Sequence, residues 1–355
     1  MALSPAHPAR ADALRAAGGR TIVETTHRAH VVVADASGRI VLAAGDPAYE
    51  TPLRSVAKPF QALAMFTSGA AERFAPSDEE LALACASHQA EDRHVAVVQA
   101  WLARLGLSAG DLACGAHAPG DADAQAGLAR AGAAPSALHN NCSGKHTAML
   151  ATALALGAPT RDYLRLPHPV QREIVKILSR LLGPDHATPA FAPSFAVDGC
   201  SAPTAVLSLG ALARLGALLV APERVGDPIL SAGLTRLSAA MTRHADLVGG
   251  RDVLDTLLMR SIVGLVAKRG ADGVYLMALA AAPGHDAPLG LAVKVEDGSA
   301  EARDAVVLAT LDALGVIGPA ARTALAGLIR APRKNHRGLV VGRWAVSLSL
   351  EGPTP

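Results

Sequence analysis

The sequence lacks the features that mark several large classes of protein. Its 33 Lys and Arg residues nearly balance 31 Asp and Glu residues, so no basic surplus is present to neutralise nucleic-acid phosphates or an anionic membrane. No stretch approaches the roughly 18 uninterrupted apolar residues of a membrane span, and the N-terminal segment contains no apolar leader region. We therefore expect a cytoplasmic protein with neither nucleic acid nor membrane as a partner.

Cysteine and lysine are both scarce. The four cysteines are too few and too scattered for a secreted disulfide framework, so we expect reduced thiols. Arginine keeps its proton whereas a buried lysine can lose it, so the few lysines of this arginine-rich chain are candidates for amine chemistry. Solvated surface positions are the alternative explanation for them. The residues are Cys85, Cys114, Cys142 and Cys200, and Lys58, Lys145, Lys176, Lys268, Lys294 and Lys334.

The order of hydrophobic patterns predicts an α+β protein. Two alternating runs within residues 21–45, joined by Ser37 and Gly38, predict an antiparallel hairpin. Helical spacing then dominates from Ser55 to about Leu265. Strand patterns return late in the chain, with one helical pattern among them. The late strands are expected at residues 273–281, 289–298 and 337–350, and the helix at residues 300–315.

Strands at both chain ends predict one antiparallel sheet with a helical lobe inserted in its middle. We expect a discontinuous sheet domain of residues 1–70 and 271–355 and a mainly helical domain of residues 71–270. The 355 residues suffice for a two-part enzyme with a large core.

The first candidate for chemistry is the segment Ser55-Val56-Ala57-Lys58. Residues three apart on a helix share a face, which brings a hydroxyl and an amine within reach of each other. A lysine whose pKa is lowered by burial or by another cation can accept the serine proton. The pattern arises often by chance, but here it follows a hairpin and opens a helix, as in the serine β-lactamases.

Two further residues can complete a serine-lysine site. Lys268 lies in a Lys-Arg-Gly sequence that we expect just before a late strand, where β-lactamases carry a second lysine motif. A cation there would favour neutral Lys58 and stabilise developing negative charge. Ser87, at the end of a helical pattern, can add a second hydroxyl. A solvated turn lysine and a surface helix cap are the alternative interpretations.

A polar segment, residues 139–146, directly precedes an apolar helical pattern. Cys142 and Lys145 stand three apart in it, and a thiol at a helix N-terminus has a lowered pKa. Cys200 follows in a glycine-containing turn that can present its thiol inward. Two thiolates and a neutral amine suit zinc with one position open. Helix capping and buried core cysteines are equally compatible with these residues.

Five segments together resemble the rhizobial-type L-asparaginase II family. They are TPLRSVAKPFQ, CASHQAEDRH, HNNCSGKHTAML, VDGCSAPT and KRGADG, and they follow the order of the family. The resemblance implies a fold similar to serine β-lactamases and glutaminases, hydrolysis of L-asparagine to L-aspartate and ammonia, and a homodimer.

The resemblance also implies roles for individual residues. Ser55 with Lys58, and Ser87 with Lys268, are implied as two serine-lysine pairs. Cys142, Lys145 and Cys200 are implied as zinc ligands. Arg54, His146 and Asp198 are implied as contacts to the substrate or to the surroundings of the metal. In the resulting mechanism Ser55 attacks the side-chain amide with Lys58 as base, and the second pair steadies the oxyanion or relays a proton.

Three other functions remain open. A glutaminase differs by one methylene in its substrate, which a pocket discriminates by only ~1–3 kcal/mol. A β-lactamase-like hydrolase would share the fold, but such enzymes act outside the cytoplasm. A catalytically idle zinc-holding protein would need the thiol and lysine cluster but not Ser55, Lys58 or Lys268.

Overall fold

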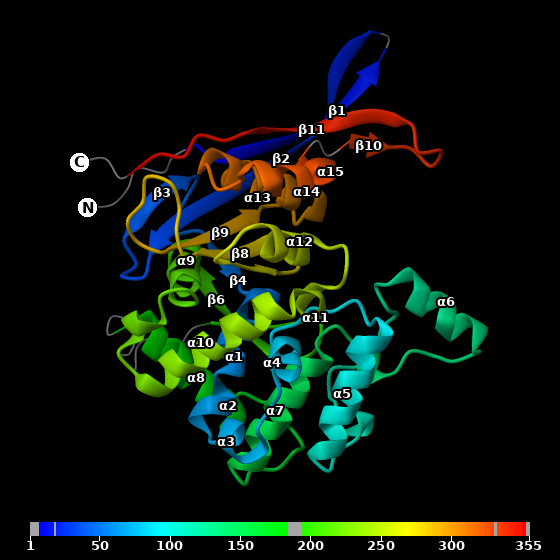
Figure 1. Ribbon diagram of the computed structural model, residues 1–355, viewed down its shortest axis with the longest axis vertical. Coiled ribbons are helices and arrows are strands. Elements are labelled where there is room, and N and C mark those ends of the chain that lie inside the picture. The colour runs from blue at the N-terminus through cyan, green and yellow to red at the C-terminus, as the bar shows by residue number, and fades with distance from the viewer. Residues whose placement is uncertain (1–6, 18, 184–193, 330–331, 353–355) are drawn as a thin grey trace. The chain divides into compact units, whose positions relative to one another are not determined.

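The computed structural model describes residues 7–17, 19–183, 194–329 and 332–352 (Figure 1). The chain divides into two compact units, and both are discontinuous in sequence. Unit 1 comprises Met1–Val56, Leu207–Ala221 and Leu257–Pro355. Unit 2 comprises Ala57–Val206 and Pro222–Thr256.

Unit 1 contains an eight-stranded antiparallel sheet built from both ends of the chain. The strand order is β10-β11-β1-β2-β9-β8-β7, and β3 also pairs with β2. The central pairing of β2 with β9 joins Val31 to Val293. The strands are β1 (Ala9–Ala17), β2 (Arg20–Asp35), β3 (Ile40–Ala44), β7 (Leu265–Arg269), β8 (Val274–Leu279), β9 (Leu289–Val295), β10 (Pro332–Lys334) and β11 (Val340–Ser347). The short β4 (Glu50–Pro52) precedes the 3-10 helix η1 (Arg54–Ala57).

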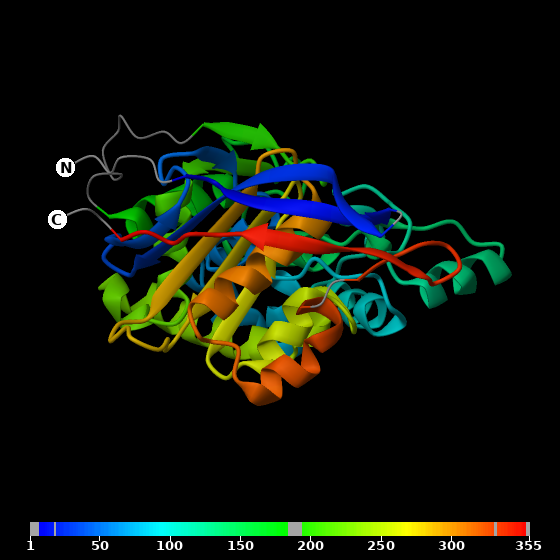
Figure 2. The same cartoon turned by 90° about the horizontal axis from the view of Figure 1, so that it is seen from above.

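Helices cover both faces of this sheet (Figures 1 and 2). Helix α9 (Leu209–Leu218) packs on β2, β8 and β9, and α13 (Ala300–Ala313) packs on β1, β9 and β11. Strands β8 and β9 are buried throughout, because each of their faces is covered. The remaining helices are α12 (Leu254–Ser261), α14 (Pro319–Ala324) and α15 (Ala326–Ile329).

Unit 2 is mainly helical. Its helices are α1 (Lys58–Ala62), α2 (Ala64–Thr67), α3 (Ala70–Phe74), α4 (Asp78–Ala84), α5 (Asp92–Arg104), α6 (Ala122–Arg130), α7 (Ser143–Ala155), α8 (Pro169–Leu182), α10 (Pro228–Arg243) and α11 (Ala245–Gly249). Short 3-10 turns are η2 (Ala109–Asp111), η3 (Ala137–His139) and η5 (Pro222–Val225). A small hairpin pairs β5 (Phe195–Val197) with β6 (Pro203–Ser208).

Local sequence explains where the helices of the site begin. Ser77 and Glu80 form a reciprocal capping box at the start of α4, as the Ser-Asp-Glu-Glu pattern indicates. Helix α7 is buried over almost its whole length, and its N-cap residue Cys142 makes no capping hydrogen bond through its side chain. Cys142 Sγ instead donates to Asn141 Oδ1 over 3.0 Å.

Several sequence predictions are confirmed and two are corrected. The fold is α+β, and the predicted hairpin is the antiparallel pair β2–β3. Lys268 precedes the predicted strand, which is β8, but it also lies inside a strand that the sequence did not predict, β7, where it pairs with Leu276 of β8. The prediction that strands return only late in the chain is also wrong, since β5 and β6 interrupt the helical region.

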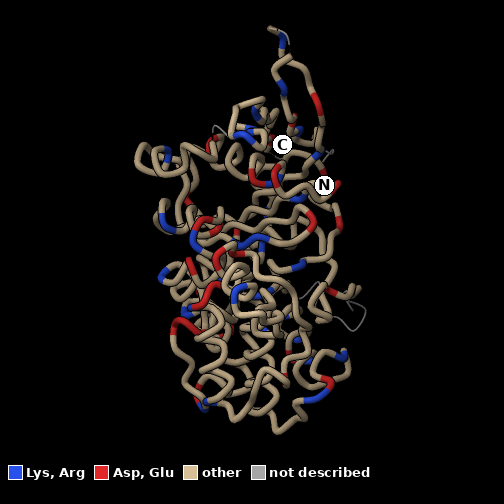
Figure 3. Tube along the Cα trace, turned by 90° about the vertical axis from the view of Figure 1, so that its right-hand side faces the viewer, with Lys and Arg blue, Asp and Glu red and all other residues tan. Residues whose placement is uncertain are grey.

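Charged residues of both signs are interspersed along the chain, in agreement with its near-neutral balance (Figure 3). Among the helices of the described residues, none combines the length and the apolar character needed to cross a bilayer.

Gly290 of β9 provides a test of the packing of α9 on the sheet. A Cβ atom at Gly290 would lie 1.8 Å from the Ala213 carbonyl oxygen and 2.3 Å from the Ala217 nitrogen of α9. Because a rigid helix backbone must then move, Gly290→Ala is expected to lower the free energy of unfolding by ~3 kcal/mol in urea titrations. Gly327→Ala is the control, because nothing lies within 4 Å of its Cβ position. Equal stability of both variants would contradict this packing.

Candidate active site

Lys58 is the central cation of the candidate site in unit 2. It is the first residue of α1, and its side chain is fully buried. Its Nζ lies 3.0 Å from Ser87 Oγ and 3.4 Å from the Asn141 carbonyl oxygen, and it also contacts the carbonyl oxygen of Ala86. The structure therefore brings Lys58 and Ser87 together.

The partners of Lys58 differ in what they can do chemically. The carbonyl oxygens of Ala86 and Asn141 can only accept hydrogen bonds. The Ser87 hydroxyl can accept one or donate one. A neutral lysine would thus keep two N–H groups on the carbonyls and direct its lone pair at the Ser87 proton. This is the geometry that a serine and its base require.

The loop after α4 holds Ser87 in place. The backbone N–H of Ser87 donates to the Val248 carbonyl oxygen over 2.8 Å. The ring of buried His88 accepts a hydrogen bond at Nδ1 from the Ala90 N–H, so Nε2 carries the proton and donates to Ser143 Oγ over 2.9 Å. His88 therefore ties the loop of Ser87 to the first residue of α7.

A second cluster lies around the N-terminus of α7. Cys142, Lys145 and Cys200 are all buried, and Lys145 Nζ lies 3.0 Å from Cys200 Sγ. Cys200 sits in the turn between β5 and β6, which is closed by a hydrogen bond from the Ser201 N–H to the Asp198 carbonyl oxygen. The predicted inward presentation of this thiol is confirmed.

The pKa values of the two thiols in this cluster are shifted in opposite directions. The pKa of Cys142 lies well below its usual value, mainly because it accepts a hydrogen bond from the Cys200 thiol, with Lys58 and Lys145 acting in the same direction. The pKa of Cys200 is raised, because that hydrogen bond holds its proton and because the thiol is buried. Burial would lower the pKa of Lys145, but the charges of the two sulfur atoms raise it above its usual value. The amine of Lys145 and the two sulfur atoms thus form one cluster.

These three donors fit zinc. Two sulfur ligands and an amine suit its preferences and leave a fourth coordination position open. The described residues contain no group of three or more His, Cys, Asp or Glu side chains placed to hold a metal ion, so zinc here depends on Lys145 as the third ligand. Binding would displace the protons of Cys200 and Lys145.

His146 and Asp198 lie close to the same cluster. His146 is fully buried, and its Nδ1 lies 2.7 Å from the Tyr163 hydroxyl. Its pKa lies well below the usual value because of burial and the neighbouring charges of Lys145 and Lys58. Asp198 is half-buried, and its charge contributes to the raised pKa of Lys145.

The other predicted site residues belong to unit 1. Ser55 is half-buried in η1, directly after Arg54, whose guanidinium forms an ion pair of 2.9 Å with Asp272. Lys268 is buried in β7, and its Nζ donates to the Arg269 carbonyl oxygen over 2.8 Å. A solvated turn lysine is therefore excluded at position 268. Ser55 and Lys58 flank the boundary between the units.

Backbone strain gathers next to these residues. Residues other than glycine rarely adopt positive φ angles, and such strain tends to be kept at functional sites. Five of the non-glycine residues with positive φ in the described chain lie close to the site. Each is within four positions of a predicted site residue, or of a residue that contacts one. They are Arg54 (φ 54°), Ala90 (φ 59°), Asp162 (φ 56°), Ser201 (φ 67°) and Asp272 (φ 53°).

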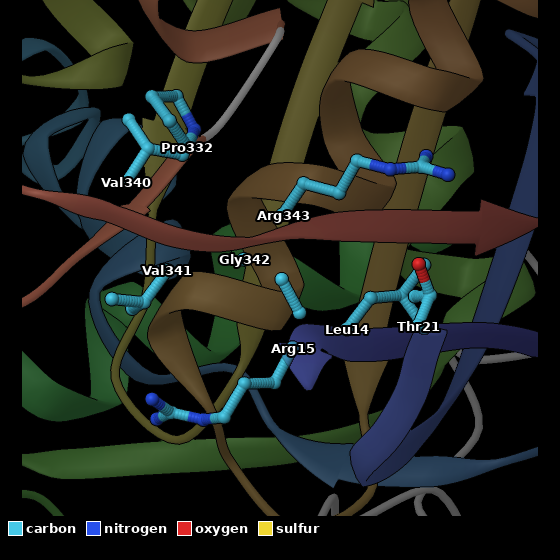
Figure 4. Close-up of a pocket in the computed structure, with 9 residues that line it drawn as sticks. Leu14, Arg15, Thr21, Pro332, Val340, Val341, Gly342 and Arg343 are labelled. Carbon is cyan, nitrogen blue, oxygen red and sulfur yellow. The ribbon is translucent and has the colours of Figure 1, made fainter. Parts of the chain in front are cut away.

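A cavity of about 350 Å³ lies elsewhere, among β1, β2, β10 and β11 of unit 1. Its wall is mainly apolar, and none of the predicted site residues lines it. The side chains of Arg15 and Arg343 at its edge extend away from each other (Figure 4), so they do not form a two-pronged anion site.

Sequence reasoning missed four residues that organise the site. His88 and Tyr163 hold site loops, the Asn141 carbonyl contacts Lys58, and Asn140 donates from Nδ2 to the Cys114 carbonyl oxygen over 2.9 Å. His88 and the two asparagines stand inside the motifs that carry the resemblance, which was the signal available for them. Tyr163 lies outside these motifs, so the sequence contains no signal for its role.

Comparisons with solved structures find distant similarities only. A probable glutaminase from Bacillus subtilis complexed with 6-diazo-5-oxo-L-norleucine is 11% identical, with 81% of this chain and 84% of that chain covered and a TM-score of 0.39. The protein Mglu in 4.3 M NaCl is 18% identical, with 76% and 56% covered and a TM-score of 0.40. A Bacillus glutaminase in 4.3 M NaCl is 11% identical, with 81% and 91% covered and a TM-score of 0.37. No curated protein matches the chain.

The match to a protein family is far more extensive. The family described as L-asparaginase II matches residues 18–346, which is nearly the whole chain. The matched range contains every predicted site residue, from Arg54 to Lys268. The chain therefore belongs to the L-asparaginase II family and is a hydrolase that acts on amides.

Proposed function

We propose that the protein hydrolyses the side-chain amide of L-asparagine to L-aspartate and ammonia through a serine acyl-enzyme, with Lys58 as the base. The observation that carries this proposal is the buried contact of 3.0 Å between Lys58 Nζ and Ser87 Oγ. Membership of the L-asparaginase II family supports the substrate. The homodimer and the cytoplasmic location expected from the sequence remain predictions.

Ser87 is the nucleophile in the mechanism that we propose. Neutral Lys58 takes the proton of the Ser87 hydroxyl as Oγ attacks the amide carbon. The resulting ammonium group then gives this proton to the amide nitrogen, which leaves as ammonia. Water then hydrolyses the ester by the same route. The sequence instead predicts Ser55 as nucleophile, with Ser87 and Lys268 steadying the oxyanion or relaying the proton.

Cys142, Lys145 and Cys200 are the residues that would hold zinc. Zinc bound there would orient the α-amino and α-carboxylate groups of asparagine beside the serine-lysine pair. This role concerns binding of the substrate and leaves the proton transfers to Ser87 and Lys58.

Substitution at Ser87 and Lys58 tests the serine-lysine pair. Ser87→Ala and Lys58→Met are each expected to lower kcat for ammonia release from L-asparagine by about 10³-fold or more. Each substitution removes the nucleophile or its base, and neither works without the other. Lys294→Met is the matched control, since Lys294 is also a buried lysine but belongs to β9, where its Nζ contacts the carbonyl oxygens of Val295 and Glu296. Ammonia release by Ser87→Ala at the parental rate would refute the pair.

The same assay separates the competing functions. The parent protein is expected to hydrolyse L-asparagine faster than L-glutamine by about 10- to 200-fold, which is the discrimination that one methylene allows. A faster reaction with L-glutamine or with a β-lactam would replace the proposed substrate. Zinc binding without any hydrolysis would identify the idle zinc-holding protein.

Covalent labelling identifies the nucleophile. A diazoketone analogue of L-asparagine, 5-diazo-4-oxo-L-norvaline, alkylates an activated serine and marks it for peptide mapping by mass spectrometry. We expect the label on Ser87 and its loss in Ser87→Ala. Label on Ser55 would assign the attack to Ser55 and leave Ser87 as the relay.

Zinc binding should depend steeply on pH. Cys200 and Lys145 both have raised pKa values, so both hold protons at neutral pH and must release them to a metal. Affinity is therefore expected to fall as pH falls, by about 100-fold for each pH unit when two protons are displaced. Calorimetry of Zn²⁺ binding in buffers of different ionisation enthalpy measures this number. Release of no proton would contradict the ligand set.

Two variants and one chelation experiment complete this test. Cys142→Ser and Cys200→Ser should lose zinc, whereas Cys114→Ser, which alters another buried thiol near the cluster, should keep it. Chelation should raise KM for L-asparagine more than it lowers kcat. Loss of turnover at unchanged KM would show that the metal acts in the chemistry.

A further inference from the structure

The hydroxyl of Tyr163 has a fixed hydrogen-bond direction. Tyr163 lies in the loop between α7 and α8, and its hydroxyl oxygen accepts a hydrogen bond of 2.9 Å from the backbone N–H of Ala113. Gln171 of α8 donates to the Tyr163 carbonyl oxygen over 2.8 Å and holds the loop. Among the described residues, His146 Nδ1 at 2.7 Å is the acceptor that the Tyr163 O–H can reach, so we assign the O–H as the donor to it.

This direction determines the tautomer of His146. An Nδ1 atom that accepts a hydrogen bond carries no proton, so the neutral imidazole must carry its proton on Nε2. The two rings also meet edge to face, with centroids 5.6 Å apart, which fixes the orientation of the imidazole. Tyr163 thus sets both the protonated atom and the direction in which it points.

The Nε2–H of His146 is a buried donor without a hydrogen-bond partner in the described part of the chain. The side chain is 0% exposed, and leaving such a donor unsatisfied is unfavourable because its hydrogen bonds to water are lost. A buried donor beside Lys145 is suited to an oxygen acceptor that carries negative charge. Asp162, directly before Tyr163, is held at a φ of 56°, so the backbone of this loop is also strained.

We propose that Tyr163 is a positioning residue that holds His146 as an Nε2–H donor for a carboxylate oxygen of the amino-acid substrate. This inference rests on the proposed amidohydrolase function and adds the atom that meets the carboxylate. Neither the Ala113–Tyr163–His146 chain of hydrogen bonds nor the tautomer follows from the motifs.

The tautomer is tested without any assay of activity. Long-range ¹H–¹⁵N spectra of protein labelled with ¹⁵N-histidine report which ring nitrogen is protonated, and loss of a resonance in His146→Gln assigns it. We expect Nε2–H in the parent and a shift toward Nδ1–H in Tyr163→Phe. A parent His146 protonated on Nδ1 would overturn the proposal, whatever the stability of the variants.

Kinetics test the consequence for the substrate. Tyr163→Phe keeps the ring, and it is expected to raise KM for L-asparagine about tenfold with kcat changed less than twofold, as loss of one oriented hydrogen bond predicts. Tyr275→Phe, at another fully buried tyrosine, is the matched control and should leave KM unchanged. An unchanged KM in folded Tyr163→Phe would refute the positioning role.

A double-mutant cycle separates positioning from a general loss of stability. If Tyr163 acts through His146, then Tyr163→Phe raises KM in the parent but adds nothing in His146→Gln. An equal rise of KM in both backgrounds would show that Tyr163 acts by another route. Absence of asparagine hydrolysis by the parent would defeat the proposed function, whereas a changed tautomer assignment would defeat only this inference.

Discussion

Burial of positive charge is the constraint around which the site in unit 2 is organised. Lys58 and Lys145 are both buried, and their neighbours are carbonyl oxygens, a serine hydroxyl and two cysteine sulfur atoms. An unpaired buried ammonium group is costly, so the surroundings must supply negative charge or release a proton. Around Lys145 negative charge comes mainly from the sulfur atoms of Cys142 and Cys200, and this raises the pKa of Lys145. Around Lys58 lie carbonyl and hydroxyl oxygens and the sulfur of Cys142, whose pKa Lys58 lowers by its charge and by a side-chain hydrogen bond.

The two lysines are thereby prepared for different tasks. Metal binding at Lys145 would release its proton to solvent, because the metal takes the nitrogen lone pair that the proton occupies. Lys58 instead has the Ser87 hydroxyl 3.0 Å away, a group with which it can exchange a proton. We therefore propose proton transfer at Lys58 and metal binding at Lys145.

Much of the fold was predictable, and the failures have physical causes. The hairpin β2–β3 and helix α13 follow from alternating and helical periodicity, which are local signals. Strand β1 was missed because its alanines favour helix in isolation. It forms because β2 and β11 pair with it from both sides and α13 packs on it, with Ala11 and Ala13 fully buried. The hairpin β5–β6 was missed because its strands are short.

In the site, too, features set by neighbouring residues could be predicted, whereas contacts between residues far apart in the sequence could not. The thiols and lysines stand in short motifs, so their residue types and spacing could be recognised. The contact between Lys58 and Ser87 joins residues 29 positions apart, and only the packing of helices makes it. Tyr163 could not be predicted at all, because its role depends on an N–H group of Ala113, which any residue except proline would supply.

The discontinuous sheet of unit 1 also bears on how the chain is made. Strand β2 is synthesised early, yet its central partner β9 follows some 260 positions later, with Val31 meeting Val293. Until β9 emerges from the ribosome, the apolar residues Val31, Val32 and Val33 lack one of the neighbours that will cover them. The long span of unit 2 is translated in this interval, so the nascent protein must shield an incomplete sheet edge for most of its synthesis.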